Sequence, residues 1–204
     1  MSRFDSVAKD WDSKSKRLEI ARSAVQAIKE QCNLKQKRIL DYGCGTGLLG
    51  FGLSDEAKEL VGMDSSRGML DVFEKKAKEL GFQNISCQFH DAHEHSLQQQ
   101  SFDSIVSSMT LHHIKDPASF MQECAAALTK EGSVCMVDLD KEDGSFHSDN
   151  SGVEHFGFCH DDIEQLMQQA GLEVTFLQNI HHISKEGKDY GVFLCIAKKR
   201  HVCG

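Results

Sequence analysis

The run from Arg38 to Gly47, RILDYGCGTG, constrains the fold of this chain more than any other stretch. It begins as a short apolar strand, reaches an acid at Asp41, and continues with glycines at alternate positions that include Gly43 and Gly45. Because glycine has no Cβ, this order is typical of a tight strand-to-helix turn in which the backbone and a ligand approach closely. The run therefore predicts a binding turn at the carboxyl end of a strand.

The same glycines also fit a second cofactor pattern. Residues 45–50, GTGLLG, match the dinucleotide fingerprint G-x-G-x-x-G, and an acid, Asp64, follows about 20 residues after it. On the glycines alone, a nicotinamide dinucleotide and S-adenosylmethionine are both candidates for the ligand.

Composition places the chain among ordinary globular proteins. Its 204 residues predict a single domain, residues 1–204, large enough to bury a core without disulfides or metals. The formal net charge of −8 argues against a general nucleic-acid or anionic-membrane binder, because such proteins depend on basic surface. The eight cysteines are scattered singly, and no signal region or membrane-length apolar stretch is found. A cytoplasmic protein with reduced thiols is expected, with the nucleus as the alternative compartment.

Apolar periodicity predicts strands that alternate with helices. Strands are expected at 38–40, 60–63, 85–89, 102–108, 133–139, 173–177 and 192–198, and helices at 14–31, 46–53, 67–80, 117–128 and 161–170. Such alternation implies a parallel sheet with right-handed crossovers, whose ligands bind outside the carboxyl ends of the strands. The last two strands are separated by a long turn rather than a helix, so one of them is expected to be antiparallel.

Three features decide between the two cofactors. Asp41 suits the ammonium group of a methionine moiety and would repel a pyrophosphate, which prefers the positive end of a helix. The turn begins at Gly43, so Gly50 falls inside the following helix and the dinucleotide match is out of register. Neither Tyr42 nor Tyr190 has the lysine four residues later that short-chain dehydrogenases use. These features favour S-adenosylmethionine and leave a NAD-dependent oxidoreductase as the weaker alternative.

On these motifs the chain resembles the class I S-adenosylmethionine-dependent methyltransferases, especially small single-domain members similar to the ubiquinone/menaquinone-biosynthesis type. Residues 41–47 match the first motif of that family without departure, and the likeness covers residues 36–198. Glu131 departs from it, because the family has a proline before the fifth strand. The resemblance implies an α/β, Rossmann-like, doubly wound and mostly parallel seven-stranded sheet of order 3-2-1-4-5-7-6, with strand 7 antiparallel.

The resemblance also implies where the cofactor binds. The positions are Asp41, Gly43, Gly45 and Gly47 for the methionine side, Asp64 for the ribose, Met69, Asp91 and Ala92 for the adenine, and Ser107 in the fourth-strand segment. Plainer interpretations stand beside some of these assignments. Asp64 and Asp91 are also suited to cap the helices that follow them, and Met69 is suited to an ordinary apolar position.

Histidines are the candidates for proton transfer. Methyl transfer depends mainly on aligning the reactants, but a hydroxyl, thiol or amine must also lose a proton, which histidine accepts readily near neutral pH. The candidates are His112 and His113 after the fourth strand, and His147 and His155 in the loop at 140–158. A scaffold role is an equal alternative for His112. The histidine-containing tracts at 90–95 and 155–160 have usable metal spacing, but no Cys-x-x-Cys pair supports them, so no metal site is expected.

The N-terminal residues 1–35 are expected to form a helical lid on a core of residues 36–198. Phe4 and Trp11 are seven residues apart and therefore lie on one face of a helix. Simple packing against the domain explains the same spacing. We favour the lid, because a closing element would also exclude water from a methyl transfer.

The sequence does not specify the methyl acceptor. The acidic balance and the lack of an added domain favour a small molecule over nucleic acid and leave a protein side chain open. A non-catalytic regulatory subunit that binds S-adenosylmethionine is the alternative from a different functional class.

Overall fold

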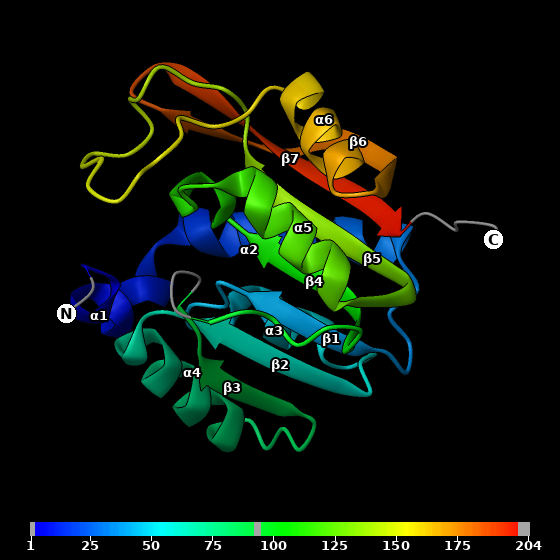
Figure 1. The fold of residues 1–204 in the computed structure, drawn as a ribbon. Helices are drawn as coiled ribbons and strands as arrows, with labels where there is room; N and C mark the ends of the chain where they lie inside the picture. The colour runs from blue at the N-terminus through cyan, green and yellow to red at the C-terminus, as the bar shows by residue number, and fades with distance from the viewer. Residues whose placement is uncertain (1–2, 92–94, 200–204) are drawn as a thin grey trace.

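The computed structural model describes residues 3–91 and 95–199, which form one sheet with helices on both faces (Figure 1). The strands are β1 (Arg38–Tyr42), β2 (Glu59–Asp64), β3 (Ile85–Phe89), β4 (Phe102–Ser108), β5 (Leu128–Leu139), β6 (Leu172–Lys185) and β7 (Lys188–Lys199). Their order is β3-β2-β1-β4-β5-β7-β6. Strands β1 to β5 pair in parallel, and β7 runs antiparallel to both β5 and β6. The predicted fold class and strand order are confirmed.

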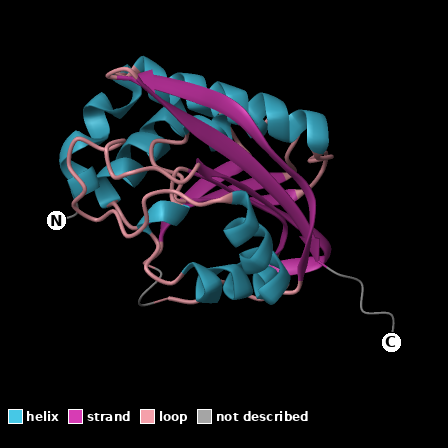
Figure 2. Ribbon diagram, turned by 90° about the horizontal axis from the view of Figure 1, so that it is seen from above, coloured by secondary structure: helices cyan, strands magenta, loops and turns pink. Residues whose placement is uncertain are grey.

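Helices cover both faces of this sheet (Figure 2). They are α1 (Arg3–Val7), a 3₁₀ helix at Ala8–Ser13, α2 (Ser15–Gln31), α3 (Leu48–Leu53), α4 (Arg67–Glu79), a 3₁₀ turn at Leu111–His113, α5 (Pro117–Ala127) and α6 (His160–Gln169). The apolar residues of α2, α3 and α4 join one core cluster, and those of α5 and α6 join the other. The sheet is therefore buried on both faces, as its near-continuous apolar central strands require.

Local signals set the ends of several helices. Ser66 caps α4 by accepting a hydrogen bond from the Met69 amide at 3.2 Å. Asp116 caps α5 in the same way, and Pro117 takes the first helical position, where its missing N–H costs nothing. Helix α3 begins at Leu48, two residues later than predicted, because Gly47 has a left-handed φ of 91°.

The predicted long turn before the last strand is wrong. Strands β6 and β7 instead pair along their whole lengths and are joined by only two residues, Glu186 and Gly187. Both have positive φ, 54° and 79°, as a tight hairpin turn requires. The sequence pattern missed this turn because glutamate rarely adopts a left-handed conformation and because the outer halves of both strands are largely polar. The hairpin carries Lys185 to the edge of the sheet where the parallel strands end.

That end of the sheet, where the parallel strands have their carboxyl ends, is also where the N-terminal segment lies, whereas β7 ends on the opposite side (Figure 1). In the part of the chain that the structure describes, no helix has the length and apolar character needed to cross a membrane.

Candidate active site

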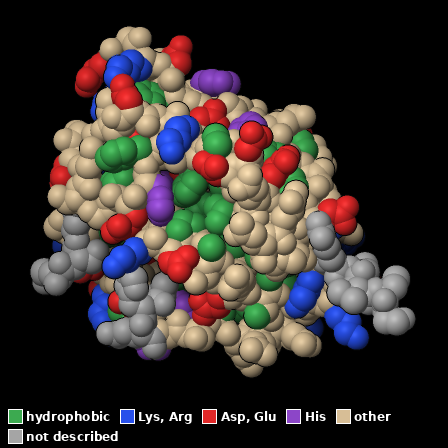
Figure 3. Space-filling model, turned by 45° about the horizontal axis from the view of Figure 1, so that its top comes forward, with side chains coloured by type: hydrophobic (Ala, Val, Ile, Leu, Met, Phe, Trp, Pro, Cys, Tyr) green, Lys and Arg blue, Asp and Glu red, His purple; other side chains and the backbone are tan. Residues whose placement is uncertain are grey.

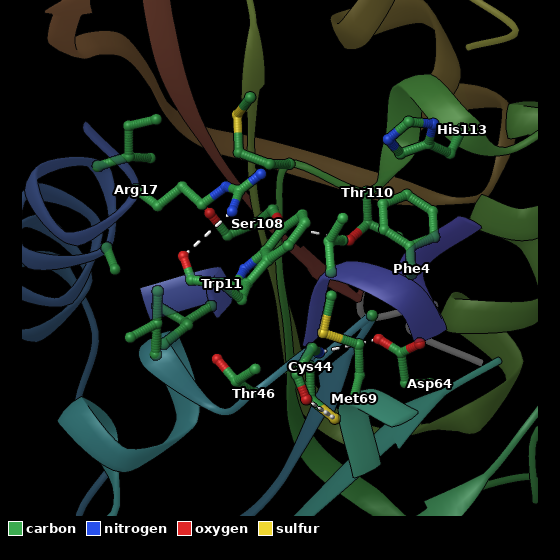
Figure 4. Close-up of a pocket in the computed structure, with 18 of the residues that line it drawn as sticks. Phe4, Trp11, Arg17, Cys44, Thr46, Asp64, Met69, Ser108, Thr110 and His113 are labelled. Carbon is green, nitrogen blue, oxygen red and sulfur yellow. Dashed lines mark hydrogen bonds between the residues drawn. The ribbon is translucent and has the colours of Figure 1, made fainter. Parts of the chain in front are cut away.

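A cavity of about 960 Å³ lies at the carboxyl ends of the parallel strands. Its walls come from the turn after β1, the ends of β2 and β3, the segment after β4, the loop after β5, the end of β6 and the N-terminal segment; Figure 4 shows part of it. Of the predicted site residues, those that line it are Asp41, Gly43, Gly45, Asp64, Met69, Asp91, His112, His113 and His147. Residues from across the whole sheet are thus brought to one chamber.

The three glycines of the turn after β1 have different roles, although all have positive φ. A Cβ on Gly43 would lie 2.2 Å from the Thr110 hydroxyl oxygen, so the lack of a side chain lets β1 and the segment after β4 approach. A Cβ on Gly47 would lie 2.4 Å from a ring carbon of Phe51, and Gly47 does not line the cavity. A Cβ on Gly45 would meet no protein atom closer than 4.0 Å. Gly45 therefore presents bare backbone to the cavity.

Asp41 is a buried acid at the end of β1. It is 1% exposed, and its Oδ2, which lies beside Gly50 of α3, meets no hydrogen-bond partner at good geometry. Burial raises the pKa of Asp41 to about 7; the nearby Gly50 amide offsets part of this rise and the charge of Asp64 adds to it. Asp41 lines the cavity, so a cation bound there beside its carboxylate would stabilise the ionised form.

Asp64 joins the turn after β1 to the start of α4. Its Oδ2 accepts a hydrogen bond from the Gly45 amide and its Oδ1 accepts one from the Ser66 amide, each at 2.8 Å. Burial raises the pKa of Asp64, and these amides oppose the rise. Ser66 provides the side-chain cap of α4, so Asp64 is not needed as that cap. Each carboxylate oxygen can accept a second hydrogen bond, which leaves Asp64 able to bind hydroxyl groups.

The remaining predicted cofactor residues differ in placement. Met69 is buried and lines the cavity beside Asp64 (Figure 4), and Asp91 lines it directly after β3. Ala92 lies outside the described residues. Ser107 does not line the cavity, because its hydroxyl donates to the Tyr42 carbonyl at 2.8 Å and ties β4 to β1.

His112 and Asp138 form a buried pair at the cavity wall. The His112 Nδ1 lies 2.7 Å from Asp138 Oδ1, and the two side chains are 1% and 0% exposed. The same carboxylate accepts hydrogen bonds from the amides of His112 and Leu139. Burial raises the pKa of Asp138, but the charge of His112 and these hydrogen bonds together hold it below its ordinary value.

This arrangement fixes the tautomer of the neutral imidazole. An ionised carboxylate only accepts hydrogen bonds, so the proton lies on Nδ1 of His112 and is donated to Asp138. The Nε2 atom then carries a lone pair, and it is buried without a hydrogen-bond partner. A proton acceptor with a fixed orientation is thereby placed in the cavity wall.

The other three candidate histidines separate into two groups. The rings of His113 and His147 line the cavity, with ring centroids 4.1 and 5.1 Å from that of His112. His113 also donates from Nδ1 to the Gly152 carbonyl at 2.6 Å. His155 does not line the cavity, and its Nε2 donates to a backbone carbonyl at 3.0 Å. Its contacts are those of a residue that holds the loop after β5, and we do not retain it as a proton acceptor.

The N-terminal segment covers one side of the cavity. The rings of Phe4 and Trp11 meet edge to face with centroids 5.8 Å apart, and both line the chamber. The Arg17 guanidinium lies over the Trp11 ring, 3.3 Å from the ring centroid, in a cation–π contact (Figure 4). Asp12 fastens the segment to the core by accepting hydrogen bonds from Thr46 at 2.5 Å and Lys76 at 2.7 Å.

Sequence reasoning missed several residues of the site. Asp138, which holds His112 but does not itself line the cavity, was the one that the sequence could best have indicated, because an acid inside the apolar run of a predicted buried strand needs a partner. His90, whose pKa burial lowers, lines the cavity and has a buried Nε2 without a hydrogen-bond partner. Arg17 and Lys185 carry no local signal, since ordinary surface cations have the same sequence context. Among the described residues, no cluster of three or more potential metal ligands is present.

Comparison with solved structures defines the class of this fold. A chain of the complex between the Haloferax volcanii Trm112 methyltransferase activator and a methyltransferase superposes with a TM-score of 0.81 at 16% identity, covering 98% of this chain and 99% of that one. A SAM-dependent methyltransferase from Aquifex aeolicus gives a TM-score of 0.75 at 20% identity, covering 95% and 97%. The architecture is that of the Rossmann-like methyltransferases.

Comparison of the sequence with protein families and with curated proteins shows the family to which the chain belongs. Residues 33–148 match the methyltransferase domain family. A ubiquinone biosynthesis O-methyltransferase of Coxiella burnetii is 26% identical over 199 residues, covering 89% of this chain and 85% of its own length. An uncharacterized methyltransferase of Schizosaccharomyces pombe is 31% identical over 66% of this chain and 52% of its own length. The chain belongs to this methyltransferase family and is a class I S-adenosylmethionine-dependent methyltransferase.

Proposed function

We propose that this methyltransferase methylates a hydroxyl group of a small, ring-containing molecule, with His112 as the base that accepts the hydroxyl proton. The observation that carries the proposal is the buried Nε2 of His112, which lacks a partner while its Nδ1 is held by Asp138. A lone pair with a fixed orientation in a cavity wall is what general base catalysis requires.

The residues at the other end of the cavity fit the cofactor. Asp41 lines the cavity and would place its buried carboxylate near the ammonium group of the methionine part, and Gly45 leaves space for close approach to the backbone. Asp64 would accept hydrogen bonds from the ribose hydroxyls, and Met69 and Asp91 would lie against the adenine. When bound, the cofactor supplies a methyl group on a cationic sulfur, which becomes a neutral thioether once the methyl has passed to the acceptor oxygen.

His112 and Asp138 then have separate tasks. His112 takes the hydroxyl proton at Nε2, which leaves the acceptor oxygen with the electron pair that forms the new bond. Asp138 keeps the imidazole in the required tautomer and stabilises the imidazolium that forms. A phenolic hydroxyl suits this base better than an aliphatic one, because phenols ionise with a pKa of about 10.

The character of the cavity supports a ring-containing acceptor. Around His112 the wall is formed by the rings of Phe4, His113, Phe146 and His147, against which a planar ring would stack. The curated relatives from Coxiella burnetii are named as O-methyltransferases of ubiquinone biosynthesis, which supports oxygen as the methylated atom.

The lid and the surface charge favour a small acceptor. We propose that the part of residues 1–35 that precedes α2, residues 3–13, acts as the lid that shields the reaction from water, because Phe4 and Trp11 line the chamber and Asp12 is bonded to the core. The buried face of α2 belongs to the core and is not part of this lid. A covered chamber suits a small molecule better than a polymer. On the face shown in Figure 3, acidic and basic side chains are interspersed, without the continuous basic patch that nucleic acids need.

Label transfer tests this function directly. The protein is incubated with methyl-labelled cofactor and a small-molecule cell extract, and label is expected in a compound with a new O-methyl group. With that acceptor, His112→Gln is expected to lower kcat about 100-fold or more with unchanged S-adenosylhomocysteine affinity. His182→Gln, an exposed histidine of β6 away from the cavity, is the matched control. Label appearing only on proteins or nucleic acids, or full turnover by His112→Gln, would contradict the proposal.

A further inference from the structure

The acidic and the basic residues that line the cavity lie on different sides of it. Its carboxylates, Asp41, Asp64 and Asp91, all lie at or just after the ends of β1, β2 and β3. Its lysines and its arginine all come from the start of α2 and the end of β6, and they are Lys14, Lys16, Arg17 and Lys185. Because β3 and β6 are the two edge strands, the acidic and basic walls lie at opposite sides of the chamber.

The proposed base lies between these two walls. His112 follows β4, and its partner Asp138 is near the end of β5, while β4 and β5 occupy the middle of the sheet. The acidic wall is the end where the cofactor fits. A molecule whose hydroxyl reaches His112 from the opposite side therefore extends toward the basic wall.

Two of these cations, Lys16 and Lys185, meet the end of β6 at neighbouring residues although they are distant in sequence. The Lys16 ammonium donates to the Ser184 carbonyl at 2.9 Å, which places it beside the strand end that carries Lys185. The Lys185 ammonium donates to the carbonyls of Ser145 and Phe146 at 3.3 and 2.9 Å. Phe146 precedes His147, whose ring lies 5.1 Å from that of His112. The Lys185 ammonium is thus bonded to the loop whose His147 lies beside the proposed base, and the Lys16 ammonium is bonded at the neighbouring residue of β6.

Neither ammonium is neutralised. Within the described ranges, 3–91 and 95–199, no salt bridge joins Lys16 or Lys185 to a carboxylate, whereas Lys29, Lys76 and Lys188 each have one. Their hydrogen bonds go to backbone carbonyls, and an ammonium group has three N–H donors, so each keeps at least one unused. Lys16 is exposed and Lys185 is half-buried, and both line one wall of the cavity, so in a chain of net charge −8 this wall is a local positive region that favours an anionic ligand.

The start of α2 adds to this positive field. Its first turn contains no acidic residue and has no side-chain cap. Acids are the residues that normally stabilise this end of a helix, and here Lys16 and Arg17 take their place. The helix terminus and its lysines act in the same direction, and an anion held there would relieve both.

We propose that the methyl acceptor carries an anionic group, of the carboxylate or phosphate type, that binds between Lys16 and Lys185 while its hydroxyl is directed to His112. This inference rests on the proposed hydroxyl methylation and names the class of acceptor for it. The two lysines are specificity-determining residues, which bind the acceptor and take no part in proton transfer.

Calorimetry with three diphenols tests the anionic subsite apart from catalysis. The protein is saturated with S-adenosylhomocysteine and titrated with 3,4-dihydroxybenzoate, its neutral analogue 3,4-dihydroxybenzamide, and catechol. The benzoate is expected to bind about 10-fold or more tightly than the amide, and this preference is expected to shrink as salt is raised. The double variant Lys16→Gln/Lys185→Gln is expected to lose the preference.

Controls separate the subsite from general charge, folding and cofactor effects. Lys58→Gln removes the same charge from an exposed lysine just before β2, at the end of the sheet opposite the cavity. This variant is expected to keep the preference for the benzoate. Lys185→Arg is expected to keep it as well. The affinity of the double variant for S-adenosylhomocysteine is expected to match that of the parent, because the lysines bind the acceptor rather than the cofactor. Its melting temperature is measured as well, since the variant loses the bonds to the carbonyls of Ser184, Ser145 and Phe146, and the comparison is made below that temperature.

The possible results distinguish the two proposals. Equal affinity for benzoate and benzamide, no binding of the benzoate, or an unchanged preference in the double variant would overturn the anionic subsite. Catechol methylated as efficiently as the benzoate would also overturn it and leave hydroxyl methylation standing. A benzoate that binds through both lysines but is never methylated would support the subsite and count against the proposed function.

Discussion

The imidazole of His112 and the carboxylate of Asp138 are 2.7 Å apart and both fully buried, although 26 residues separate them in sequence. The pair is placed where β4 and β5 end side by side, in the middle of the sheet. Its geometry orients a proton acceptor between the end of the cavity that fits the cofactor and the wall that carries the lysines.

Asp138→Asn tests the role of this pair. The asparagine amide keeps the shape but not the charge, so His112 loses the partner that holds its proton on Nδ1 and stabilises its imidazolium. We expect kcat for the acceptor to fall at least about 100-fold with little change in KM, because proton transfer and not binding is impaired. Steady-state kinetics over a range of pH measure the effect. Parent-like kcat in a folded Asp138→Asn variant would refute the orienting role.

Two glycine substitutions are expected to impair different properties, cofactor affinity at Gly45 and fold stability at Gly47. Gly45→Ala directs a methyl group into open cavity, so we expect S-adenosylhomocysteine affinity to fall at least 10-fold while the fold loses only about 1 kcal/mol from the positive φ. Gly47→Ala forces a methyl group against Phe51 and should destabilise the fold by about 1–3 kcal/mol beyond that strain. Calorimetry and urea denaturation separate the two effects. Similar losses of both quantities in both variants would contradict the assignment.

The raised pKa of Asp41, about 7, predicts that cofactor binding releases protons. A cation beside the carboxylate favours its ionised form, so S-adenosylmethionine is expected to bind more tightly as pH rises from 5 toward 8 and to displace up to one proton near pH 6. Calorimetric titrations in two buffers of different ionisation enthalpy count that proton. Asp41→Asn should bind weakly without proton release. Equal heats in both buffers at pH 6 for the parent protein would refute this linkage.

The same pKa shift has a consequence for the ligand-free protein. An acid whose pKa is higher in the folded state than in the unfolded chain destabilises the fold as it ionises. Asp41 is therefore expected to lower the free energy of unfolding as pH rises from about 4 to about 7, by up to about 4 kcal/mol. Asp41→Asn should lack this decline. The test is urea denaturation of both proteins at several pH values, and curves that run parallel would rule it out.

Trp11 reports on the N-terminal segment, because it is the sole tryptophan of the chain. Asp12→Ala removes the bonds to Thr46 and Lys76, so we expect Trp11 emission to shift to longer wavelength and S-adenosylhomocysteine affinity to fall several-fold. Fluorescence titration measures both quantities. Asp10→Ala, an exposed acid of the same 3₁₀ helix, should leave both unchanged. If Asp12→Ala matched the parent in both quantities, residues 3–13 would not be a lid held by Asp12.

Sequence patterns predicted most of the fold because the signals are local. Apolar runs of strand length, helical spacing and the glycine turn depend on a few neighbouring residues, and they were sufficient to place the strands and the main helices. The hairpin between β6 and β7 failed because its turn uses Glu186 in a left-handed conformation that the residue type does not announce. The polar outer half of β6 is a strand because it pairs with β7, and its own sequence pattern does not predict a strand.

The sequence by itself determined the glycine turn, the acids at or just after the ends of β1, β2 and β3, and the cofactor they favour. The tertiary structure alone decided which histidine has a buried carboxylate, that Ser107 and His155 lie outside the chamber, and that Lys16 meets the end of β6 across 168 residues. The physical reason is how far apart in the sequence the interacting residues are. Backbone conformation and apolar periodicity are set by near neighbours, whereas hydrogen bonds and charge pairing in a cavity depend on chain segments that only folding brings together.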